Sequence, residues 1–141
     1  MPRRDLNDWF WHVSAEFTGL TVEPGSRQVS VAANKFWQPR VDVLEDARVI
    51  LIKAELAGVR INDIHLAYVA DEHALQLRGV RYEENPPEMK RVGIHQLEVF
   101  YGEFERDIPL PKNIEIDPER IHASFHNGFL MVLVPKREPQ P

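Results

Sequence analysis

The last part of the chain holds the stretch that decides the fold: residues 120–136 read RIHASFHNGFLMVLVPK. Apolar and polar side chains alternate over residues 120–125, which is the two-residue period of a strand with one buried face. Asn127-Gly128 follows, and this pair is a strong signal for a two-residue hairpin turn. The apolar run of residues 129–134 comes next, so the stretch predicts a β-hairpin that closes the fold.

Shorter β-type runs bounded by turn residues fill the chain upstream of this hairpin. Residues 63–69 and 75–79 keep the two-residue period on either side of a turn at 70–72 and predict a second hairpin. The other predicted strands are residues 40–44, 48–56 and 97–108, the last with Gly102 as a bulge or a close backbone approach. Because no helical pattern is interleaved, these about eight short strands predict an all-β, immunoglobulin-like antiparallel β-sandwich over residues 36–136.

Residues 1–35 predict an arm outside this sandwich. Apolar side chains recur at spacings of three and four over residues 5–19, which predicts a short amphipathic helix. Residues 21–34 are polar and small around Pro24-Gly25, which predicts a flexible linker. At the other end of the chain, residues 137–141 form a short tail.

The composition is typical of a single soluble globular domain, with 141 residues of which 43% are hydrophobic and 28% charged. No apolar run approaches the ~20 residues that span a bilayer, and the start lacks the apolar core of a secretory signal. We therefore expect a cytoplasmic protein without membrane partners. The net charge of −5, with no basic block, disfavours nucleic acid as a partner.

The sequence offers no recognisable catalytic chemistry. It contains no cysteine, which excludes disulfides, thiolate catalysis and Cys-ligated metals, and it has neither a phosphate-binding glycine loop nor a serine elbow. His122 and His126 would share a zinc ion on a helix, but on a strand they lie roughly 13 Å apart. Glu83-Glu84 is more simply a solvated loop pair, although a glycosidase pair that forms only in three dimensions stays an alternative. We expect no enzymatic activity, no cofactor and no metal.

Three motifs follow one another in a recognisable order. They are Leu75-Gln76-Leu77-Arg78-Gly79 with Arg81, Gly102-Glu103-Phe104-Glu105-Arg106 with Leu110-Pro111, and Ala123 ahead of Asn127-Gly128-Phe129-Leu130 and Val134-Pro135-Lys136. Their order and spacing resemble the α-crystallin domain of the small heat-shock proteins over residues 36–136. The main departure is the absence of the relatives' Ile-x-Ile tail motif after Lys136. Residues 114–116 fit that motif, but their place between two predicted strands indicates connector packing.

The resemblance implies a holding chaperone that works without ATP. Such proteins bind unfolding client proteins, prevent their aggregation and pass them to ATP-driven chaperones. In bacterial and plant relatives, a strand within a long loop crosses to a partner subunit and makes a homodimer. The resemblance implies that this strand lies at Met89, Lys90, Arg91, Val92, Gly93 and Ile94, and that Arg106 lies at or near the dimer interface. Without the tail motif, we expect dimers or small oligomers of dimers.

The residues themselves leave alternatives open for the loop of residues 81–95 and for Arg106. Residues 81–95 are long for a hairpin connection, and a long loop in a compact domain usually has a function, but its Glu- and Pro-rich half is also compatible with disorder. Arg106 lies in a region dense with carboxylates, including Glu98 and Glu103, which favours an interface. A solvated arginine at a sheet edge is the alternative.

Client binding needs exposed apolar surface, and two surfaces qualify. One is the arm face of Trp9, Phe10, Val13 and Phe17, although such a stripe also packs on its own domain. The other is a groove between the strand of Ile64, Leu66 and Tyr68 and the strand of Ile121 and Phe125, where relatives receive the tail motif. Without a tail we expect this groove to stand open, unless its side chains fill the core. The functional alternatives are a CS-domain-like co-chaperone or adaptor and a sandwich enzyme with a deep polar pocket.

Overall fold

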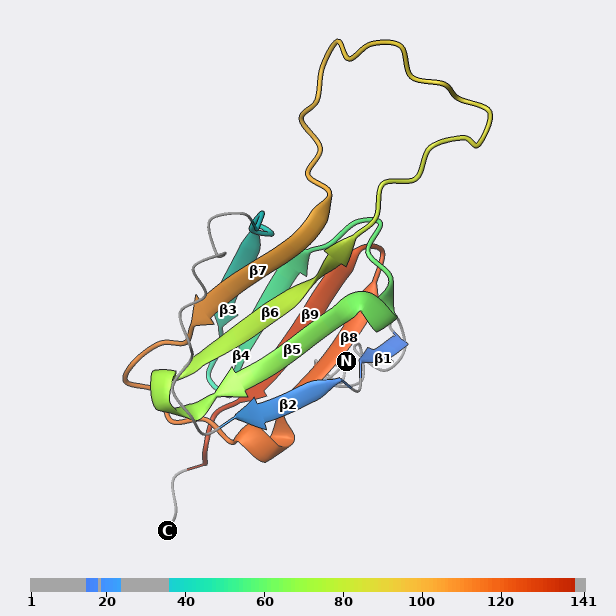
Figure 1. Ribbon diagram of the computed structural model, residues 1–141. Coiled ribbons are helices and arrows are strands. Elements are labelled where there is room, and N and C mark those ends of the chain that lie inside the picture. Colours follow the sequence, from blue (N-terminus) through green and yellow to red (C-terminus); the bar gives the residue numbers. More distant parts are fainter. Residues whose placement is uncertain (1–14, 18, 24–35, 139–141) are drawn as a thin grey trace.

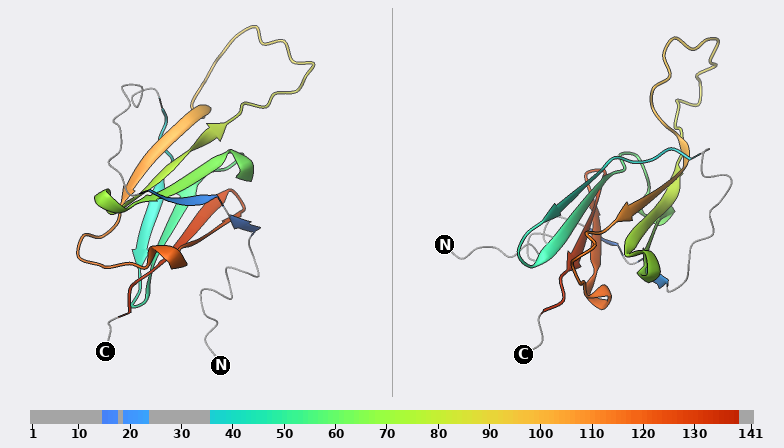
Figure 2. Two further views of the ribbon diagram at one scale, coloured as in Figure 1. Left: turned by 60° about the horizontal axis from the view of Figure 1, so that its bottom comes forward. Right: turned by 90° about the vertical axis from the view of Figure 1, so that its left-hand side faces the viewer.

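Two β-sheets pack face to face in the structure, a computed structural model that describes residues 15–17, 19–23 and 36–138 (Figures 1 and 2). The five-stranded sheet has the order β1-β8-β9-β4-β3 and the four-stranded sheet the order β2-β5-β6-β7, which confirms the predicted β-sandwich. In chain order the strands are β1 Ala15–Phe17, β2 Leu20–Glu23, β3 Val41–Glu45, β4 Val49–Glu55, β5 Ile64–Val69, β6 Ala74–Arg81, β7 Gly102–Pro109, β8 His122–His126 and β9 Phe129–Pro135. Short 3-10 helices at η2 Ile61–Asp63, η3 Ala70–Glu72 and η4 Pro118–Arg120 lie in the connections.

Every second side chain of the central strands enters one core between the sheets. Ile50 and Ile52 of β4 pair in register with Val134 and Val132 of β9, and all four are buried. They face buried side chains of the opposite sheet, among them Phe104. Successive side chains of a strand point to opposite faces, so the alternating apolar pattern places its apolar half here. Removing this apolar surface from water, at roughly 25 cal/mol per Å², is the main stabilising term of the fold.

The predicted hairpin turn at Asn127-Gly128 is confirmed. Both residues have positive φ, 52° and 79°, as a two-residue hairpin turn requires. Gly128 also packs against the turn that follows β4, where Leu56 N–H donates to the Gly128 carbonyl at 2.6 Å. A Cβ on Gly128 would come within 2.9 Å of the Ala57 Cα, so glycine is required at this contact as well as by φ.

The arm predictions are wrong where the structure describes the arm. β1 pairs antiparallel with β8 and β2 pairs parallel with β5, so residues 15–17 are not helical and residues 21–23 are not a linker. Unpaired backbone groups at the edges of β5 and β8 provide hydrogen-bond partners that outweigh the local helical spacing, and the β-branched Thr21 and Val22 suit a strand. The rest of the predicted helix and linker lies outside the described residues.

The strand predicted for residues 97–108 is wrong in its first part, because β7 begins only at Gly102. The last register pair of β6 and β7 joins Arg81 to Gly102, beyond which the two chains diverge into the loop of residues 82–101. Residues 97–101 are exposed, and no strand of the described residues pairs with them. The interpretation of residues 114–116 as a connector is confirmed, since Ile116 is buried and bridges to Lys136.

Gly79 marks a close approach of β6 to its neighbours. A Cβ at this position would lie 2.3 Å from the Asp63 carbonyl oxygen and 2.4 Å from Cζ of Phe104. The first contact is with backbone and the second is with the largest fully buried side chain. Neither group can move aside without a loss of packing energy.

We therefore expect Gly79→Ala to lower the free energy of unfolding by about 3 kcal/mol, because the added methyl overpacks the core. Gly93→Ala is the matched control, since a Cβ there meets nothing within 4 Å, and we expect it to change stability by less than about 0.5 kcal/mol. Urea unfolding followed by far-UV circular dichroism measures both. Equal stability of the two variants would show that β6 can move away from β5 and β7 without cost.

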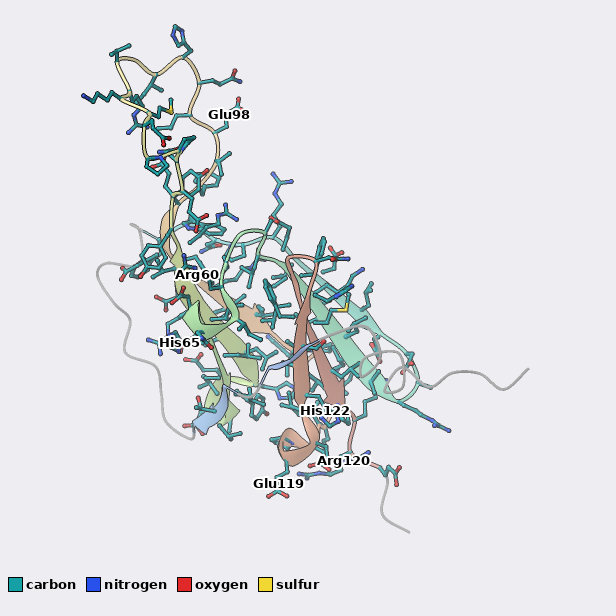
Figure 3. All side chains as sticks on the ribbon, turned by 90° about the vertical axis from the view of Figure 1, so that its right-hand side faces the viewer. Arg60, His65, Glu98, Glu119, Arg120 and His122 are labelled. Carbon is teal, nitrogen blue, oxygen red and sulfur yellow. The ribbon has the colours of Figure 1, made fainter. Side chains whose placement is uncertain are left out.

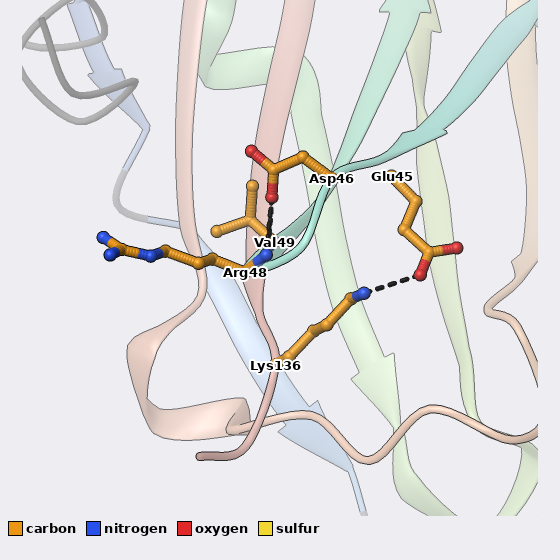
Figure 4. Close-up of polar contacts among 5 residues, drawn as sticks. All are labelled: Glu45, Asp46, Arg48, Val49 and Lys136. Atoms are coloured by element: carbon orange, nitrogen blue, oxygen red, sulfur yellow. Dashed lines mark hydrogen bonds and ion pairs between the residues drawn. The ribbon is translucent and has the colours of Figure 1, made fainter. Parts of the chain in front are cut away.

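The turn between β3 and β4 is held by a carboxylate (Figure 4). Oδ1 of Asp46 accepts hydrogen bonds from the backbone N–H groups of Val49, at 2.8 Å, and Arg48, at 2.7 Å. These bonds hold the pKa of Asp46 below its usual value of 3.8. Close by, Nζ of Lys136 lies 2.6 Å from Oε2 of Glu45 and ties the end of β9 to β3.

Because the pKa of Asp46 is lowered in the folded state, its charge stabilises the fold above the unfolded pKa, and this stabilisation is lost as pH falls through the folded pKa. We expect Asp46→Asn, which keeps an acceptor oxygen but no charge, to be less stable than the wild type at pH 7. The difference should shrink below about pH 4 and vanish once Asp46 is protonated. Thermal unfolding of both proteins between pH 2.5 and 7 checks this, and a difference that does not depend on pH would contradict it.

Candidate functional site: an exposed loop and the sheet edges

The loop of residues 82–101 projects beyond the two sheets, as the views in Figures 1 and 2 agree. Every residue of the loop is exposed. Its exposed large apolar side chains are Tyr82, Met89, Val92, Ile94, Leu97, Val99, Phe100 and Tyr101. An apolar concentration of this kind on one segment marks an interaction surface. Residues 89–94, predicted to form a strand with a partner subunit, form no strand within the single chain.

Among the described residues, two exposed and therefore weak ion pairs involve the loop. Arg60 Nη2 lies 3.2 Å from Oε1 of Glu84, and the two side chains are 69% and 77% exposed. Arg91 Nη1 lies 3.7 Å from Oε1 of Glu83. Exposed pairs of this type contribute between zero and about 1 kcal/mol, so these contacts do not fasten the loop to the sandwich.

β3 forms one end of the five-stranded sheet and leaves its outer edge unpaired among the described residues. Val43 and Leu44 on this strand are exposed apolar side chains. An exposed edge strand presents a row of backbone donors and acceptors and is a template for strand addition. β3 is therefore a second surface suited to another polypeptide.

Arg106, predicted to lie at a dimer interface, is half-buried on β7. Its Nη1 donates to the Pro39 carbonyl at 2.8 Å, and Pro39 is buried just before β3 begins. Next to it, Nε2 of Gln76 donates to Oε1 of Glu105 at 3.2 Å. Arg106 thus orders the approach to the β3 edge from within its own subunit, and its contact with a partner stays a prediction.

The structure brings the predicted groove residues of β5 and β8 together, but it does not leave them open. Ile64, Leu66, Tyr68 and Ile121 are buried in the core, and Phe125 packs against it partly buried. The outer edge of β5 is covered by β2, with Leu20 opposite Leu66, and that of β8 by β1. The expectation of an open groove is therefore wrong, because these side chains fill the core and strands β2 and β1 cover the outer edges of β5 and β8. We call residues 15–23, of which residue 18 lies outside the described residues, the strap.

Tyr68 has a polar contact at the end of this buried row. Its hydroxyl lies 3.1 Å from Nδ1 of His73, whose Nε2 lies 3.1 Å from the Pro111 carbonyl. Because a carbonyl only accepts, Nε2 of His73 carries the proton and Nδ1 accepts from Tyr68 when the ring is neutral. Burial raises the pKa of the Tyr68 phenol, which keeps it a donor. This contact fastens the turn after β5 to the chain beyond β7.

Of the residues predicted to form the arm face, the structure describes only Phe17. Phe17 lies in β1, where its backbone is in register with Ala123. Trp9, Phe10 and Val13 lie outside the described residues, so their role in client binding stays a prediction.

Titratable side chains do not gather into one chemical site. Figure 3 shows Glu98 out on the loop and Glu119, Arg120 and His122 at the far end of the sandwich. Within residues 15–17, 19–23 and 36–138, no group of three His, Asp or Glu side chains is placed to hold a metal ion. None of the helices described is long and apolar enough to cross a bilayer. A hollow of about 500 Å³ lies at the base of the loop beside Arg81 and Tyr101.

Known sequences place these features in a family. The profile of the Hsp20/alpha crystallin family matches residues 42–141. Small heat shock protein C2 of Rickettsia felis is 37% identical over 100 residues, which cover 71% of this chain and 61% of that protein. The chain likewise covers 61% of small heat shock protein C4 from the same organism. The 18.1 kDa class I heat shock protein of Arabidopsis thaliana is 35% identical over 140 residues, 97% of this chain and 81% of that protein.

Solved structures agree with the sequences. Heat shock protein 16.0 from Schizosaccharomyces pombe matches with a TM-score of 0.61 and 32% identity, over 74% of this chain and 92% of that one. A small heat-shock protein from Xylella fastidiosa matches with a TM-score of 0.61 and 30% identity, over 74% and 91%. The family profile covers most of the chain and the two-sheet fold is shared, so this chain belongs to the Hsp20/alpha crystallin family of small heat-shock proteins.

Proposed function

We propose that this protein is a holding chaperone that binds unfolding client proteins without ATP and keeps them from aggregating. The observation that carries the proposal is the apolar row of β5 and β8, whose outer edges are covered only by the short strands β2 and β1 among the described residues. Membership of the small heat-shock protein family supports it. The protein acts in the cytoplasm, without enzymatic activity of its own, and releases clients to ATP-driven chaperones.

The working unit is a homodimer, alone or in small oligomers of dimers. Residues 89–94 of one subunit pair with the β3 edge of the other, and the exchange is reciprocal because a two-fold axis makes each contact occur twice. Apolar residues such as Val92 and Ile94 would then leave water together with Val43 and Leu44 of β3, all of which are exposed in the single chain. Arg106, which holds the approach to β3 through Pro39, lies close to this contact.

Clients bind at the arm face and at the β5–β8 groove, and the groove opens when the strap moves. The strap is attached by strands of only three and four residues. Val22 on β2 stays 53% exposed, so its burial contributes little to the attachment. An extended apolar segment of a client can replace β2 on β5 by forming the same backbone hydrogen bonds.

Light scattering of a heat-aggregating client enzyme tests the chaperone activity in the absence of ATP. We expect the full chain to suppress aggregation at an equimolar subunit ratio, because exposed client apolar surface is covered. Scattering that is unchanged even at fivefold excess would contradict the proposal. If the wild type also sediments as a stable monomer, the adaptor alternative takes its place.

The dimer contact is tested by Val92→Asp, which places a charge on the apolar side of the loop. We expect this variant to weaken the dimer at least tenfold in sedimentation velocity runs, since a desolvated charge without a partner is costly. Asn85→Asp is the matched control, because it adds the same charge at a polar, exposed position of the same loop. Equal weakening by both substitutions would indicate simple charge repulsion and contradict pairing by the apolar residues.

A disulfide tests whether the strap controls client access. Thr21 and Ala67 are register partners in β2 and β5, and the chain has no cysteine of its own. In Thr21→Cys/Ala67→Cys, neighbouring strands bring the two Cα atoms within disulfide range, so oxidation locks the strap. We expect at least threefold weaker suppression of aggregation when oxidised and recovery on reduction.

The matched control for this lock joins two strands that do not need to separate. Asp42 and Lys53 are register partners in β3 and β4, and Asp42→Cys/Lys53→Cys should suppress aggregation equally in both redox states. If the locked strap also leaves suppression unchanged, clients do not enter the β5–β8 groove. The arm face of Trp9, Phe10 and Val13 would then carry client binding.

A further inference from the structure

Arg81 occupies the base of the exposed loop, where it is the last residue of β6 and lies opposite Gly102 of β7. Its side chain donates hydrogen bonds to two different segments at the base. Nε donates to the Phe100 carbonyl at 2.8 Å, on the returning side of the loop, and Nη1 donates to the Ala57 carbonyl at 3.1 Å. Hydrogen bonds from a charged donor are stronger than those between neutral groups, so Arg81 joins both ends of the loop to the turn after β4.

Trp37 forms the other half of this contact. The Arg81 guanidinium carbon lies 4.2 Å from the centroid of the Trp37 ring, within the range of a cation–π interaction. The same ring stacks on Phe100, with centroids 6.2 Å apart and planes 13° apart, and its Nε1 donates to the Gly102 carbonyl at 3.1 Å. The backbone of Trp37 bridges in parallel to Phe104 of β7. We call Arg81 and Trp37 together the clamp.

The clamp ties the loop to both sheets. Ala57 follows β4 of the five-stranded sheet, whereas Arg81 and Gly102 end β6 and β7 of the four-stranded sheet. Trp37 lies shortly before β3, the edge strand with the unpaired outer side. The direction of the loop and the position of β3 are therefore fixed by one set of contacts.

Among the described residues, few other contacts fix that direction. The hollow of about 500 Å³ lies directly beside Arg81 and is lined also by Gly58, Tyr82 and Val99, so the loop base is not packed on this side. Gly102 has φ +92°, a backbone angle that residues other than glycine rarely adopt. This angle lets the chain turn sharply at the end of the loop. The ion pairs farther out, at Arg60 and Arg91, are exposed and weak.

A small change in the direction of the loop at its base causes a large displacement of residues 89–94, which are proposed to pair with the partner. Met89 lies eight residues beyond Arg81, which is at most roughly 26 Å along an extended chain. At that reach, a swing of about 10° moves the chain by about 4–5 Å, close to the spacing of neighbouring strands in a sheet. A loop that swings freely by this amount would meet the wrong row of hydrogen-bond partners on the other subunit. Holding the direction in advance also lowers the ordering cost of association.

We propose that the clamp positions the loop for dimerisation, so that Arg81 and Trp37 determine dimer affinity although neither belongs to the surfaces that touch the partner. This inference rests on the dimer of the proposed function. The partner is a second copy of this chain, and the clamp acts by presenting residues 89–94 at the angle that its β3 edge requires.

The test compares dimer dissociation constants from sedimentation velocity at a series of dilutions. Arg81→Met keeps the length of the side chain but loses both hydrogen bonds and the cation–π contact, and we expect it to weaken the dimer at least tenfold. Arg81→Lys keeps the charge, and Trp37→Phe keeps an aromatic ring but loses the bond to Gly102; each should weaken it about threefold. Arg60→Met, at the exposed pair with Glu84 beside the same loop, is the matched control and should change it less than twofold.

Hydrogen exchange separates positioning from a general loss of stability. We expect faster exchange at residues 82–101 of the Arg81→Met subunit and unchanged exchange at β4 and β9. If Arg81→Met fails to fold, Arg81→Lys and Trp37→Phe carry the test. A clamp variant with a dimer constant within twofold of the wild type, while the wild type dimerises, overturns this inference alone. A wild type that stays monomeric at 100 µM overturns the proposed dimer together with it.

Discussion

The unpaired backbone groups at the sheet edges are the constraint on which the rest of this structure depends. A β-sandwich buries its two inner faces, but each sheet still ends in strands with outward N–H and C=O groups that need partners. The chain treats its edges differently. β5 and β8 receive the arm strands β2 and β1, and β7 receives the backbone of Trp37. Among the described residues, the outer edge of β3 has no partner strand. The candidate functional surfaces of this protein are therefore edges rather than a cavity.

The loop and the strap are held to the sandwich by different kinds of contact. Arg81 holds the loop with hydrogen bonds to two carbonyl groups and an aromatic ring below it, all of which have a defined direction. The strap is held by backbone pairing and a small apolar contact through Leu20. A directional contact suits the fixed loop angle that we propose, whereas short strand pairing suits the proposed detachment of the strap.

The sandwich could be predicted from the sequence because its strands obey local rules. Alternation over residues 48–56 and 63–69 and the Asn127-Gly128 turn report on a buried face and on backbone angles, and both are properties of neighbouring residues. The arm strands could not be predicted in this way. Residues 15–17 carry helical spacing, and only the edge of β8, far away in the sequence, makes them a strand. The strand prediction for residues 97–101 was wrong for the opposite reason, since their strand-like pattern has no partner strand in the part of the chain that the structure describes.

The candidate site was predictable to the same extent. The exposed apolar residues of the loop follow from its length and composition, whereas the clamp joins Trp37, Ala57, Arg81 and Phe100 across long sequence separations. The sequence signals only one half of the clamp, because Arg81 follows the Leu75–Gly79 motif whereas Trp37 belongs to none of the quoted motifs. Its function becomes visible only when the two ends of the loop are placed opposite each other.

If clients bind as proposed, strand exchange at an edge would let this protein hold them without ATP. A client segment that replaces β2 on β5 forms backbone hydrogen bonds of the same number and kind as those that it breaks, so the net free energy of exchange comes mainly from side chains. At roughly 25 cal/mol per Å² of apolar surface, a client richer in apolar residues than Leu20–Glu23 displaces the strap, and a client that refolds and buries those residues loses the competition. Under this proposal, the folding state of the client would set both capture and release, and no nucleotide would be required.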